Sequence, residues 1–219
     1  MSSSTVQIIS IEGNIGSGKS TLLANLKENC PNVVFLKEPV DEWEKIRDEN
    51  GTTMLEKFYA DQTKYSFSFQ MMAYISRLKI LRDTIRNHPE RPITIITERS
   101  LNTDKMVFAK MLYDSGKIEH INYQIYLSWF DTFSAEYPVQ KHIYVKTDPE
   151  ICHKRIHIRS RNGEDNIPID YLVSCSEYHD DMMEVVEGDK LVLDGNVDIY
   201  ENTEVLSEWI DTIRRFIGE

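Results

Sequence analysis

The sequence is poor in cysteine and has neither a basic leader nor a long apolar run. Cys30, Cys152 and Cys175 are far apart and lack the spacing of metal ligands, so we expect reduced thiols. No stretch approaches the roughly 18–20 apolar residues that span a membrane. The opening segment MSSSTVQIIS resembles neither a secretory signal nor a transit peptide. The sequence therefore predicts a cytoplasmic protein without a membrane partner.

Positive charge is also scarce. The 219 residues include 25 Lys and Arg against 36 Asp and Glu, giving a net charge of -11. Such a field repels phosphate backbones, so nucleic acid is not an expected partner. The six histidines show no metal-binding spacing and are expected to be structural or surface residues. Any anionic ligand must therefore be held by a local cluster of positive groups.

Short apolar runs alternate with amphipathic helical patterns. Runs rich in β-branched residues predict five buried strands, at Val6 to Ile11, Val33 to Leu36, Ile93 to Ile96, His142 to Val145 and Leu191 to Leu193. Strands separated by helices favour a parallel sheet covered on both faces. We predict an α/β fold with a five-stranded parallel sheet flanked by helices, in one domain spanning residues 1–219. Ligands of such folds bind at the carboxyl ends of the strands.

A glycine-rich segment directly follows the first predicted strand. GNIGSGKST fits the pattern G-x-x-x-x-G-K-[ST] between a strand and a helix, which is typical of a P-loop. Its backbone N–H groups and the following helix start favour phosphate oxygens. We expect Lys19 to reach the β- and γ-phosphates and Ser20 to join a Mg²⁺ shell. The predicted phosphate-binding residues are Gly13, Asn14, Ile15, Gly16, Ser17, Gly18, Lys19, Ser20 and Thr21. A GTPase switch, an ATPase motor and a kinase all remain compatible with this motif.

Polar residues follow the second and third predicted strands. Glu38 comes directly after one strand, and Glu98, Arg99 and Ser100 end the other. Burying three polar groups there is costly unless they have charged partners. We expect Glu98 to hold Mg²⁺ directly or through water. Arg99 is expected to pair with Glu38, or with the 5′-oxygen of a substrate, and to keep the carboxylate ionised and oriented. Ser100 is a candidate cap for the next helix. A structural ion pair at the sheet end is the alternative.

The long helical pattern before the third strand carries a possible base-binding face. Phe69, Ala73 and Arg77 are spaced four residues apart and share one side of the helix, with Gln70 beside them. Phenylalanine can stack on a base, and glutamine offers a donor and an acceptor. Arg77 needs an acidic partner, for which Asp104 is the candidate. A purely structural salt bridge is the alternative.

Three arginines fall within seven residues of this acidic chain. Arg155 and Arg159 share a helix face and repel each other unless an anion lies between them, and Arg161 follows. Triphosphate oxygens are such an anion. Asn162-Gly163 interrupts the pattern and suits a lid that closes after ATP binds. We predict an arginine-bearing lid at about residues 155–168, with a solvated basic helix end as the alternative.

Five segments in order resemble the deoxynucleoside kinase family, especially its deoxycytidine and deoxyguanosine kinase branch. They are GNIGSGKST, KEPVDEW at 37–43, YSFSFQMMAYISR at 65–77, ERSLNTDKMVF at 98–108, and RIHIRSRNGED with IPIDYL within 155–172. The resemblance implies a P-loop kinase fold, ATP as phosphate donor and Mg²⁺. It also implies a homodimer joined through helices, for which Met71, Met72, Ile75 and the region of Phe130 would supply a face.

The resemblance assigns catalytic roles as well. Glu38 would take the proton of the sugar 5′-hydroxyl, which phosphoryl transfer requires only late because its transition state is loose. Arg99 would position that carboxylate. Lys19, Arg159 and Arg161 would neutralise the moving charge. Arg155 would contact the triphosphate, and Asp194 would lie near its adenine.

The implied nucleoside site uses a second set of residues. Arg77 and Asp104 would read the base edge and Gln70 would pair with it, which favours a base with an exocyclic amine. Phe58 departs from the methionine usual in relatives and narrows the pocket. The remaining implied contacts are Trp43, Phe69, Ala73 and Phe108 around the base, and Tyr59 and Glu164 at the sugar 3′-hydroxyl.

The predicted function is ATP-dependent phosphorylation of a deoxynucleoside at its 5′-hydroxyl in nucleotide salvage. Deoxycytidine is the first choice of substrate and purine deoxynucleosides follow. A thymidylate-type nucleoside monophosphate kinase is one alternative, but it would need extra arginines near Gln70 and Ala73 to clamp an acceptor phosphate. A non-catalytic P-loop nucleotide-binding protein is the other alternative.

Overall fold

The computed structural model describes residues 6–90, 92–161, 164 and 167–219. Asn162 and Gly163, which form part of the predicted lid, lie outside these residues. The three predicted lid arginines, Arg155, Arg159 and Arg161, precede this gap and are described, as is Glu164.

Five parallel strands form one sheet in the order β2-β3-β1-β4-β5. They are β1 (Val6–Glu12), β2 (Val33–Leu36), β3 (Ile93–Glu98), β4 (Lys141–Lys146) and β5 (Asp189–Asp194). The predicted five-stranded parallel sheet is confirmed, and β1 and β3 extend to the glutamates that follow their apolar runs. The register pairs Ile11 with Glu98, so the start of the P-loop and the end of β3 meet at one sheet edge.

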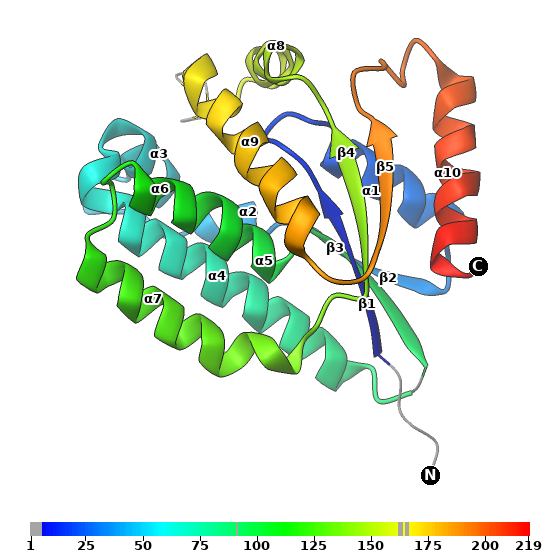
Figure 1. Cartoon of the computed structure of the whole chain (residues 1–219), viewed down its shortest axis with the longest axis horizontal. Coiled ribbons are helices and arrows are strands. Elements are labelled where there is room, and N and C mark those ends of the chain that lie inside the picture. Colours follow the sequence, from blue (N-terminus) through cyan, green and yellow to red (C-terminus); the bar gives the residue numbers. More distant parts are fainter. Residues whose placement is uncertain (1–5, 91, 162–163, 165–166) are drawn as a thin grey trace.

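Helices cover both faces of the sheet (Figure 1). One face carries α1 and α10, while α4, α5 and α9 lie over the other. The helical elements are α1 (Lys19–Asn29), α2 (Val40–Trp43), α3 (Met54–Ala60), α4 (Gln62–Asn87), α5 (Leu101–Thr103), the π-helix η1 (Asp104–Ala109), α6 (Lys110–Asp114), α7 (His120–Phe133), the 3₁₀-helix η2 (Ser134–Glu136), α8 (Pro149–Arg159), α9 (Ile169–Val185) and α10 (Thr203–Ile217).

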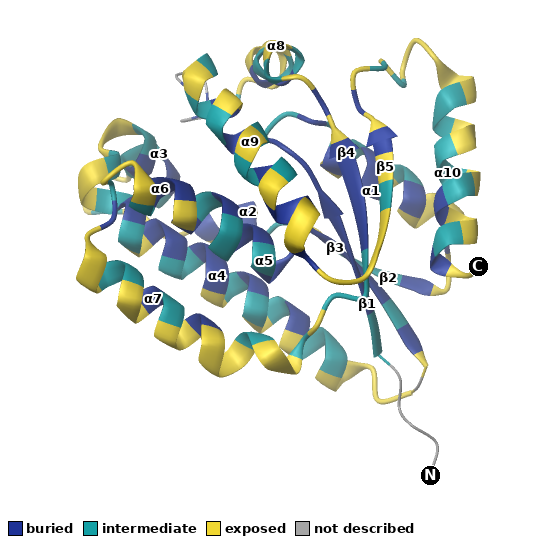
Figure 2. Cartoon of the chain, viewed as in Figure 1, coloured by how far each residue is buried: buried dark blue, intermediate teal, exposed yellow. Residues whose placement is uncertain are grey.

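The alternation of side chains along β1 distributes the core between these two faces. Ile9 and Ile11 pack in one cluster with residues of α1 and α10, whereas Ile8 packs with Leu81 of α4. Figure 2 shows the buried residues concentrated in the sheet and on the helix sides that face it. Since Glu98 lies two residues beyond Ile96, it continues the face that meets α1.

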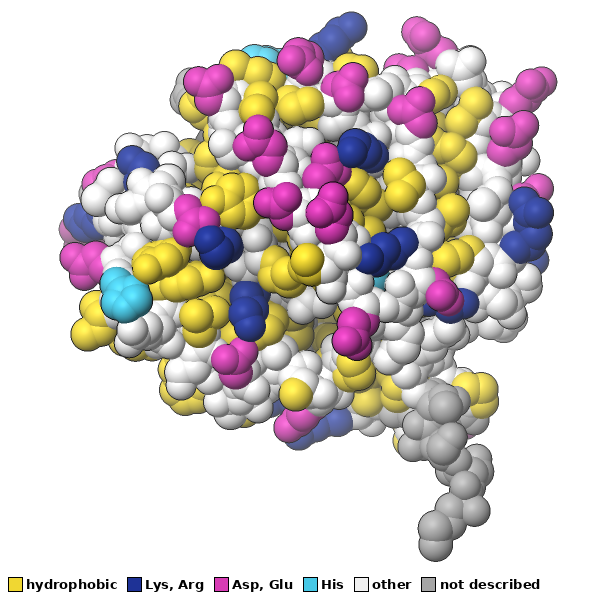
Figure 3. Space-filling view, viewed as in Figure 1, with side chains coloured by type: hydrophobic (Ala, Val, Ile, Leu, Met, Phe, Trp, Pro, Cys, Tyr) yellow, Lys and Arg dark blue, Asp and Glu magenta, His cyan; other side chains and the backbone are white. Residues whose placement is uncertain are grey.

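The surface agrees with the acidic composition. Figure 3 shows acidic side chains spread over the face that carries α9 and α10, with basic side chains interspersed. Within the described ranges, no helix combines the length and apolar character needed to cross a membrane.

The region of Phe130 has one buried and one exposed side. Phe130 itself is 4% exposed and packs against Tyr74 and Tyr126. Trp129 and Phe133, which flank Phe130 by one and three residues, are exposed on the other side of α7. The periodicity of α7 alone does not show which side faces α4.

Candidate active site

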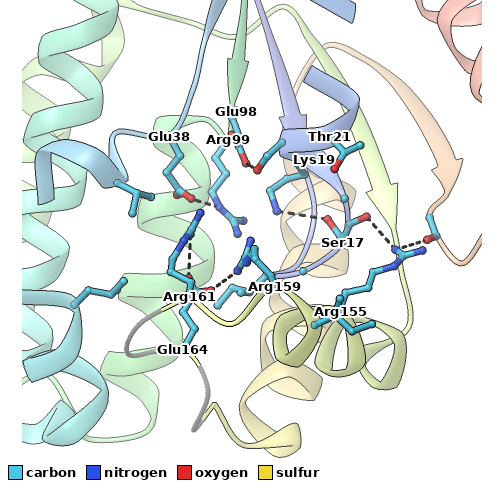
Figure 4. A pocket seen from close by; sticks show the side chains of 18 of the residues that line it. Ser17, Lys19, Thr21, Glu38, Glu98, Arg99, Arg155, Arg159, Arg161 and Glu164 are labelled. Carbon is cyan, nitrogen blue, oxygen red and sulfur yellow. Dashed lines mark hydrogen bonds and ion pairs between the residues drawn. The ribbon is translucent and has the colours of Figure 1, made fainter. Parts of the chain in front are cut away.

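A cavity of about 490 Å³ opens at the carboxyl ends of the strands (Figure 4). One end is the P-loop, and the other is a group of aromatic side chains from α2, α3 and α4. The predicted site residues that line it are Ile15, Gly16, Ser17, Gly18, Lys19, Ser20, Thr21, Glu38, Trp43, Tyr59, Phe69, Gln70, Glu98, Arg99, Asp104, Phe108, Arg155, Arg159, Arg161 and Glu164. Residues from nearly the entire chain therefore meet around one space.

The P-loop depends on two glycines that lack room for a side chain. A Cβ at Gly13 would lie 2.6 Å from the carbonyl oxygen of Val145, and one at Gly16 would lie 2.6 Å from that of Cys152. Both glycines have positive φ, which L-residues rarely adopt. Asn14 anchors the loop by donating to the carbonyl of Leu172 in α9, at 2.8 Å. The loop is thus held against both β4 and α9.

Lys19 is buried without a carboxylate in hydrogen-bond contact among the described residues. Its Nζ donates to the carbonyl oxygen of Asn14 at 2.6 Å and lies 3.4 Å from Ser17 Oγ. Burial, and then the positive charge of Arg99, lower the pKa of Lys19 to about 7. A phosphate group placed in the loop would supply the missing negative charge.

Ser20 and Glu98 form a compact pair of oxygen ligands. Ser20 Oγ donates to Glu98 Oε1 at 2.5 Å. Mg²⁺ prefers oxygen ligands and usually takes only one or two carboxylates, with phosphate oxygens and water completing its shell. Within the described residues, no cluster of three or more His, Cys, Asp or Glu forms a dedicated metal cage. The donor set therefore fits Mg²⁺ brought together with a nucleotide.

Glu38 lies between two arginines at the centre of the cavity. Its Oε1 is 3.2 Å from Arg99 Nε and 3.0 Å from Arg77 Nη2. Burial alone would raise the pKa of Glu38, but the charges of Arg99, Arg77 and Lys19 outweigh it and lower the pKa to about 2. This carboxylate is consequently ionised throughout the neutral range.

Arg77 joins Glu38 to Asp104. Its Nε donates to Asp104 Oδ2 at 2.9 Å, and its Nη1 donates to the carbonyl oxygen of Glu98 at 2.7 Å. The side chain is 7% exposed and does not line the cavity, whereas Asp104 does. Arg77 thus fixes the carboxylates of Glu38 and Asp104 from a position outside the cavity wall.

Aromatic rings close the far end of the cavity. Phe58 stacks on Phe69 with centroids 4.5 Å apart, and Trp43 meets Phe69 edge-on at 5.5 Å. Gln70 is 2% exposed, and its Oε1 has no hydrogen-bond partner among the described residues. A buried unpaired acceptor is costly, so this oxygen marks a place where a ligand donor fits.

Glu164 gathers two of the three predicted lid arginines. Arg159 Nη2 donates to Glu164 Oε2, and Arg161 Nη1 donates to Glu164 Oε1 at 3.1 Å (Figure 4). Arg155 takes a different course, since it donates to the carbonyl oxygens of Gly195 at 2.8 Å and Val197 at 3.2 Å. The three arginines that the sequence predicts to bind a triphosphate therefore donate to backbone carbonyl oxygens and to a carboxylate in this structure.

Some predicted residues stay outside the cavity wall, and others were missed. Gly13, Asn14, Ala73, Arg77 and Asp194 do not line it. In place of Asp194, the following residues Gly195 and Val197 to Tyr200 contribute the wall beside α8. Tyr171 and Ile158 also line the cavity and were missed. Tyr171 lies in IPIDYL and Ile158 precedes Arg159, and neither residue type indicates a binding site by itself.

A missed residue of another kind is His179 of α9. It is fully buried, and its Nε2 lies 3.2 Å from Arg99 Nη1. The two residues are 80 positions apart, so the sequence gives no hint of their contact.

Comparisons with known proteins agree with this geometry. The family model described as deoxynucleoside kinase matches residues 9–218. A probable deoxycytidine kinase of fowlpox virus (strain NVSL) is 33% identical over 219 residues, covering 96% of this chain and 88% of that protein. Human deoxycytidine kinase is 32% identical, covering 80% of this chain and 74% of its own length. Human mitochondrial thymidine kinase 2 is 30% identical, covering 80% and 64%, respectively.

The match extends across the P-loop, the Glu38 and Glu98–Asp104 segments and the α8–α9 region, which together build the cavity. The chain belongs to the deoxynucleoside kinase family.

Proposed function

We propose that this protein transfers the γ-phosphoryl group of ATP to the 5′-hydroxyl of a deoxynucleoside, with deoxycytidine preferred and purine deoxynucleosides next. The observation that carries the proposal is the continuity of the cavity. A P-loop lies at one end, an aromatic pocket at the other, and an ionised carboxylate, Glu38, between them. Residues 1–219 are proposed to act as one catalytic domain.

The donor end provides positive charge where phosphate oxygens would lie. Lys19 and the P-loop N–H groups bind the triphosphate. Ser20 and Glu98 would hold Mg²⁺, which when bound neutralises phosphate charge. Arg159 and Arg161 lie across the cavity on Glu164 and form the proposed lid, in which they exchange part of that pairing for phosphate oxygens.

The acceptor hydroxyl is activated by Glu38. A carboxylate with a pKa of about 2 is a weak base, but a loose phosphoryl-transfer transition state needs the proton to leave only late. Position therefore matters more than basicity. Arg99 holds the carboxylate at 3.2 Å and keeps it ionised.

The base end favours a partner that offers N–H donors. Gln70 Oε1 and the carboxylate of Asp104 are both acceptors on the cavity wall. An exocyclic amine, as on cytosine or adenine, can donate to them, whereas the thymine carbonyl cannot. Phe69 and Phe108 are proposed to flank the base, with Trp43 at its edge. Ala73, one turn after Phe69 on α4, has a small side chain that does not narrow this space.

The sugar end is assigned to Tyr59 and Glu164. Both line the cavity, and Tyr59 meets Tyr171 edge-on at 6.5 Å, which fixes the ring against α9. Their hydroxyl and carboxylate are proposed to bind the 3′-hydroxyl. The ring of Tyr59 then occupies the space that a ribose 2′-hydroxyl would need.

The direct test is a phosphoryl-transfer assay with radiolabelled ATP and Mg²⁺. Each of the four deoxynucleosides and deoxycytidine monophosphate is offered separately at limiting concentration, and the products are identified by chromatography. We expect deoxycytidine 5′-monophosphate to form fastest. Phosphorylation of the monophosphate but not of any nucleoside would instead establish a nucleoside monophosphate kinase. ATP consumption that ignores every acceptor would contradict both.

We also propose a homodimer that pairs α4 and α7 of two copies. On α7, Ile121, Ile125, Trp129 and Phe133 repeat every four residues and are 64%, 43%, 50% and 37% exposed. Ile75 of the adjacent α4 is 51% exposed, whereas Met71 and Met72 are partly covered by their own core clusters. A continuous apolar stripe of this kind is typical of a contact surface.

A further inference from the structure

Two of the three guanidinium nitrogens of Arg99 have partners. Its Nε faces Glu38 at 3.2 Å, and its Nη1 donates to the carbonyl oxygen of Gly13 at 2.7 Å. The second Nη1 contact is His179 Nε2 at 3.2 Å, and the ring of Phe108 lies 4.9 Å from Cζ. Nη2 donates no hydrogen bond to any of the described residues. One guanidinium nitrogen thus remains available on the wall of the cavity.

The contacts of His179 define its protonation state. Its Nδ1 lies 2.6 Å from the carbonyl oxygen of Cys175, which can only accept a hydrogen bond, so Nδ1 carries the proton. Arg99 Nη1 can only donate, so Nε2 must present its lone pair. Both hydrogen bonds require the same neutral tautomer.

The surroundings of His179 oppose a second proton. Arg99, which directly follows β3, and Lys19 of α1 both place positive charge near it. Tyr144 of β4 stacks on the ring at 6.4 Å. Phe108 of η1 meets the ring edge-on at 6.1 Å. Burial, and then the charge of Arg99, lower the pKa of His179 well below its ordinary value, despite the opposing hydrogen bond to Cys175.

We propose that His179 is a positioning residue for phosphoryl transfer, acting as a permanently neutral acceptor that orients the Arg99 guanidinium. With Nη1 held by His179 and Gly13, the plane of the group is fixed. Its Nε then points to Glu38 and its Nη2 is left for the oxygens of the substrates. This role rests on the proposed function.

A neutral acceptor suits this place better than a carboxylate. A second acid beside Arg99 would neutralise the charge that keeps Glu38 ionised, and it would compete for the same N–H groups. A neutral imidazole orients the guanidinium group without neutralising the positive charge of Arg99. The backbone of Arg99 adds to this constraint, because its φ of 64° lies in the left-handed region.

His142 provides a matched control within the same chain. It is likewise buried, at 1% exposed, and bonds to Ser10 Oγ at 2.9 Å and to the carbonyl oxygen of Glu187 at 3.1 Å. None of these partners lines the cavity. Replacing this histidine disturbs the core to a similar degree without touching Arg99.

The kinetic test compares His179→Phe, His179→Gln and His142→Phe. We expect His179→Phe to lower kcat by about 10- to 100-fold with little change in either KM, because orientation is lost while binding residues remain. His179→Gln, which restores an acceptor, should recover kcat to within about fivefold of the original protein. His142→Phe should leave kcat unchanged. Retention of kcat by His179→Phe, or equal losses in the Phe and Gln variants, would overturn the proposal.

A second test uses the unmodified protein and does not depend on folding of a variant. Ring ¹⁵N shifts of His179 should report the Nδ1–H neutral tautomer at every pH from about 8 down to about 5.5, where an ordinary histidine titrates. The opposite tautomer, or titration near the ordinary value, would refute the inference. If the neutral tautomer is present but no deoxynucleoside is phosphorylated, the hydrogen bond stands and the proposed function falls, together with the positioning role of His179 in phosphoryl transfer.

Discussion

The charges of neighbouring side chains in the cavity shift one another's pKa values. Arg99 helps to lower the pKa of both Lys19 and Glu38, but with opposite consequences. Glu38 becomes more firmly charged, whereas Lys19 is close to half protonated at neutral pH. A phosphate group bound beside Lys19 would favour its charged form.

Glu38→Gln tests the base directly. We expect kcat to fall by about 10²- to 10⁴-fold while ATP still binds, because the amide cannot accept the proton. Steady-state kinetics and an ATP-binding titration measure the two effects. Asp41→Asn, which changes an exposed carboxylate three residues away, should be neutral. A near-normal kcat in Glu38→Gln would exclude this residue as the base.

The pH dependence of stability follows from the same carboxylate. The pKa of Glu38 is lowered in the folded protein from 4.5 to about 2. Its stabilising contribution is thus fully present above the unfolded value and is lost as the pH falls through that window. The free energy of unfolding should therefore fall less steeply with decreasing pH in Glu38→Gln than in the original protein, because the variant has no carboxylate to protonate in this window. Denaturant titrations between about pH 7 and pH 2 measure this, and parallel curves for both proteins would contradict it.

Lys19 should take up a proton when ATP binds. Its pKa of about 7 in the ligand-free protein leaves it partly neutral, and phosphate charge favours the ammonium form. At pH 7 we expect an uptake of about half a proton from this residue, rising at higher pH and vanishing near pH 5.5. Calorimetry in buffers of different ionisation enthalpy measures the uptake. Lys19→Arg, which stays charged, should show none. Identical binding heats in all buffers would disprove this.

At the scale of secondary structure, the sequence predicts the elements that are determined by local residue patterns. The strands follow from β-branched runs, and the P-loop follows from its glycines and its place between a strand and a helix. Ser100 caps α5 as expected, accepting from the Thr103 backbone N–H at 3.2 Å. The π-helix η1 has no Pro or Gly to signal it. The link from Arg77 to Glu38 was not predicted either, because it joins α4 to the segment that follows β2, and this contact is a property of the tertiary fold.

The pairing of α4 with η1 should control which base is accepted. Removing only Arg77 would leave Asp104 buried and unpaired, at a cost of about 3–5 kcal/mol. Replacing Arg77 and Asp104 together with Met and Ala avoids that cost and opens space at the base edge. We expect kcat/KM for thymidine relative to deoxycytidine to rise by about tenfold or more.

Absolute kcat of this double variant should fall, since Glu38 loses one of its two arginines. Competition assays with both nucleosides measure the ratio independently of this loss. An unchanged ratio, or an unmodified protein that already prefers thymidine, would show that the base edge is read elsewhere.

At the scale of the whole molecule, the apolar stripe of α7 predicts the oligomeric state. Trp129 stacks on Phe133, with ring centroids 5.8 Å apart. Trp129→Glu therefore places a charge within the proposed interface. We expect a dimer for the original chain and a monomer for this variant in analytical ultracentrifugation, because burying an unpaired charge is costly. Val185→Glu, at a 64% exposed position on α9, should remain dimeric. A monomeric original chain would refute the interface.

The strand order β2-β3-β1-β4-β5 interleaves distant parts of the chain, and the cavity wall runs from Ile15 to Trp209. A ribosome must consequently release almost the entire polypeptide before any nucleotide has a complete place to dock. Ligand binding can therefore stabilise only a chain that is complete or nearly so.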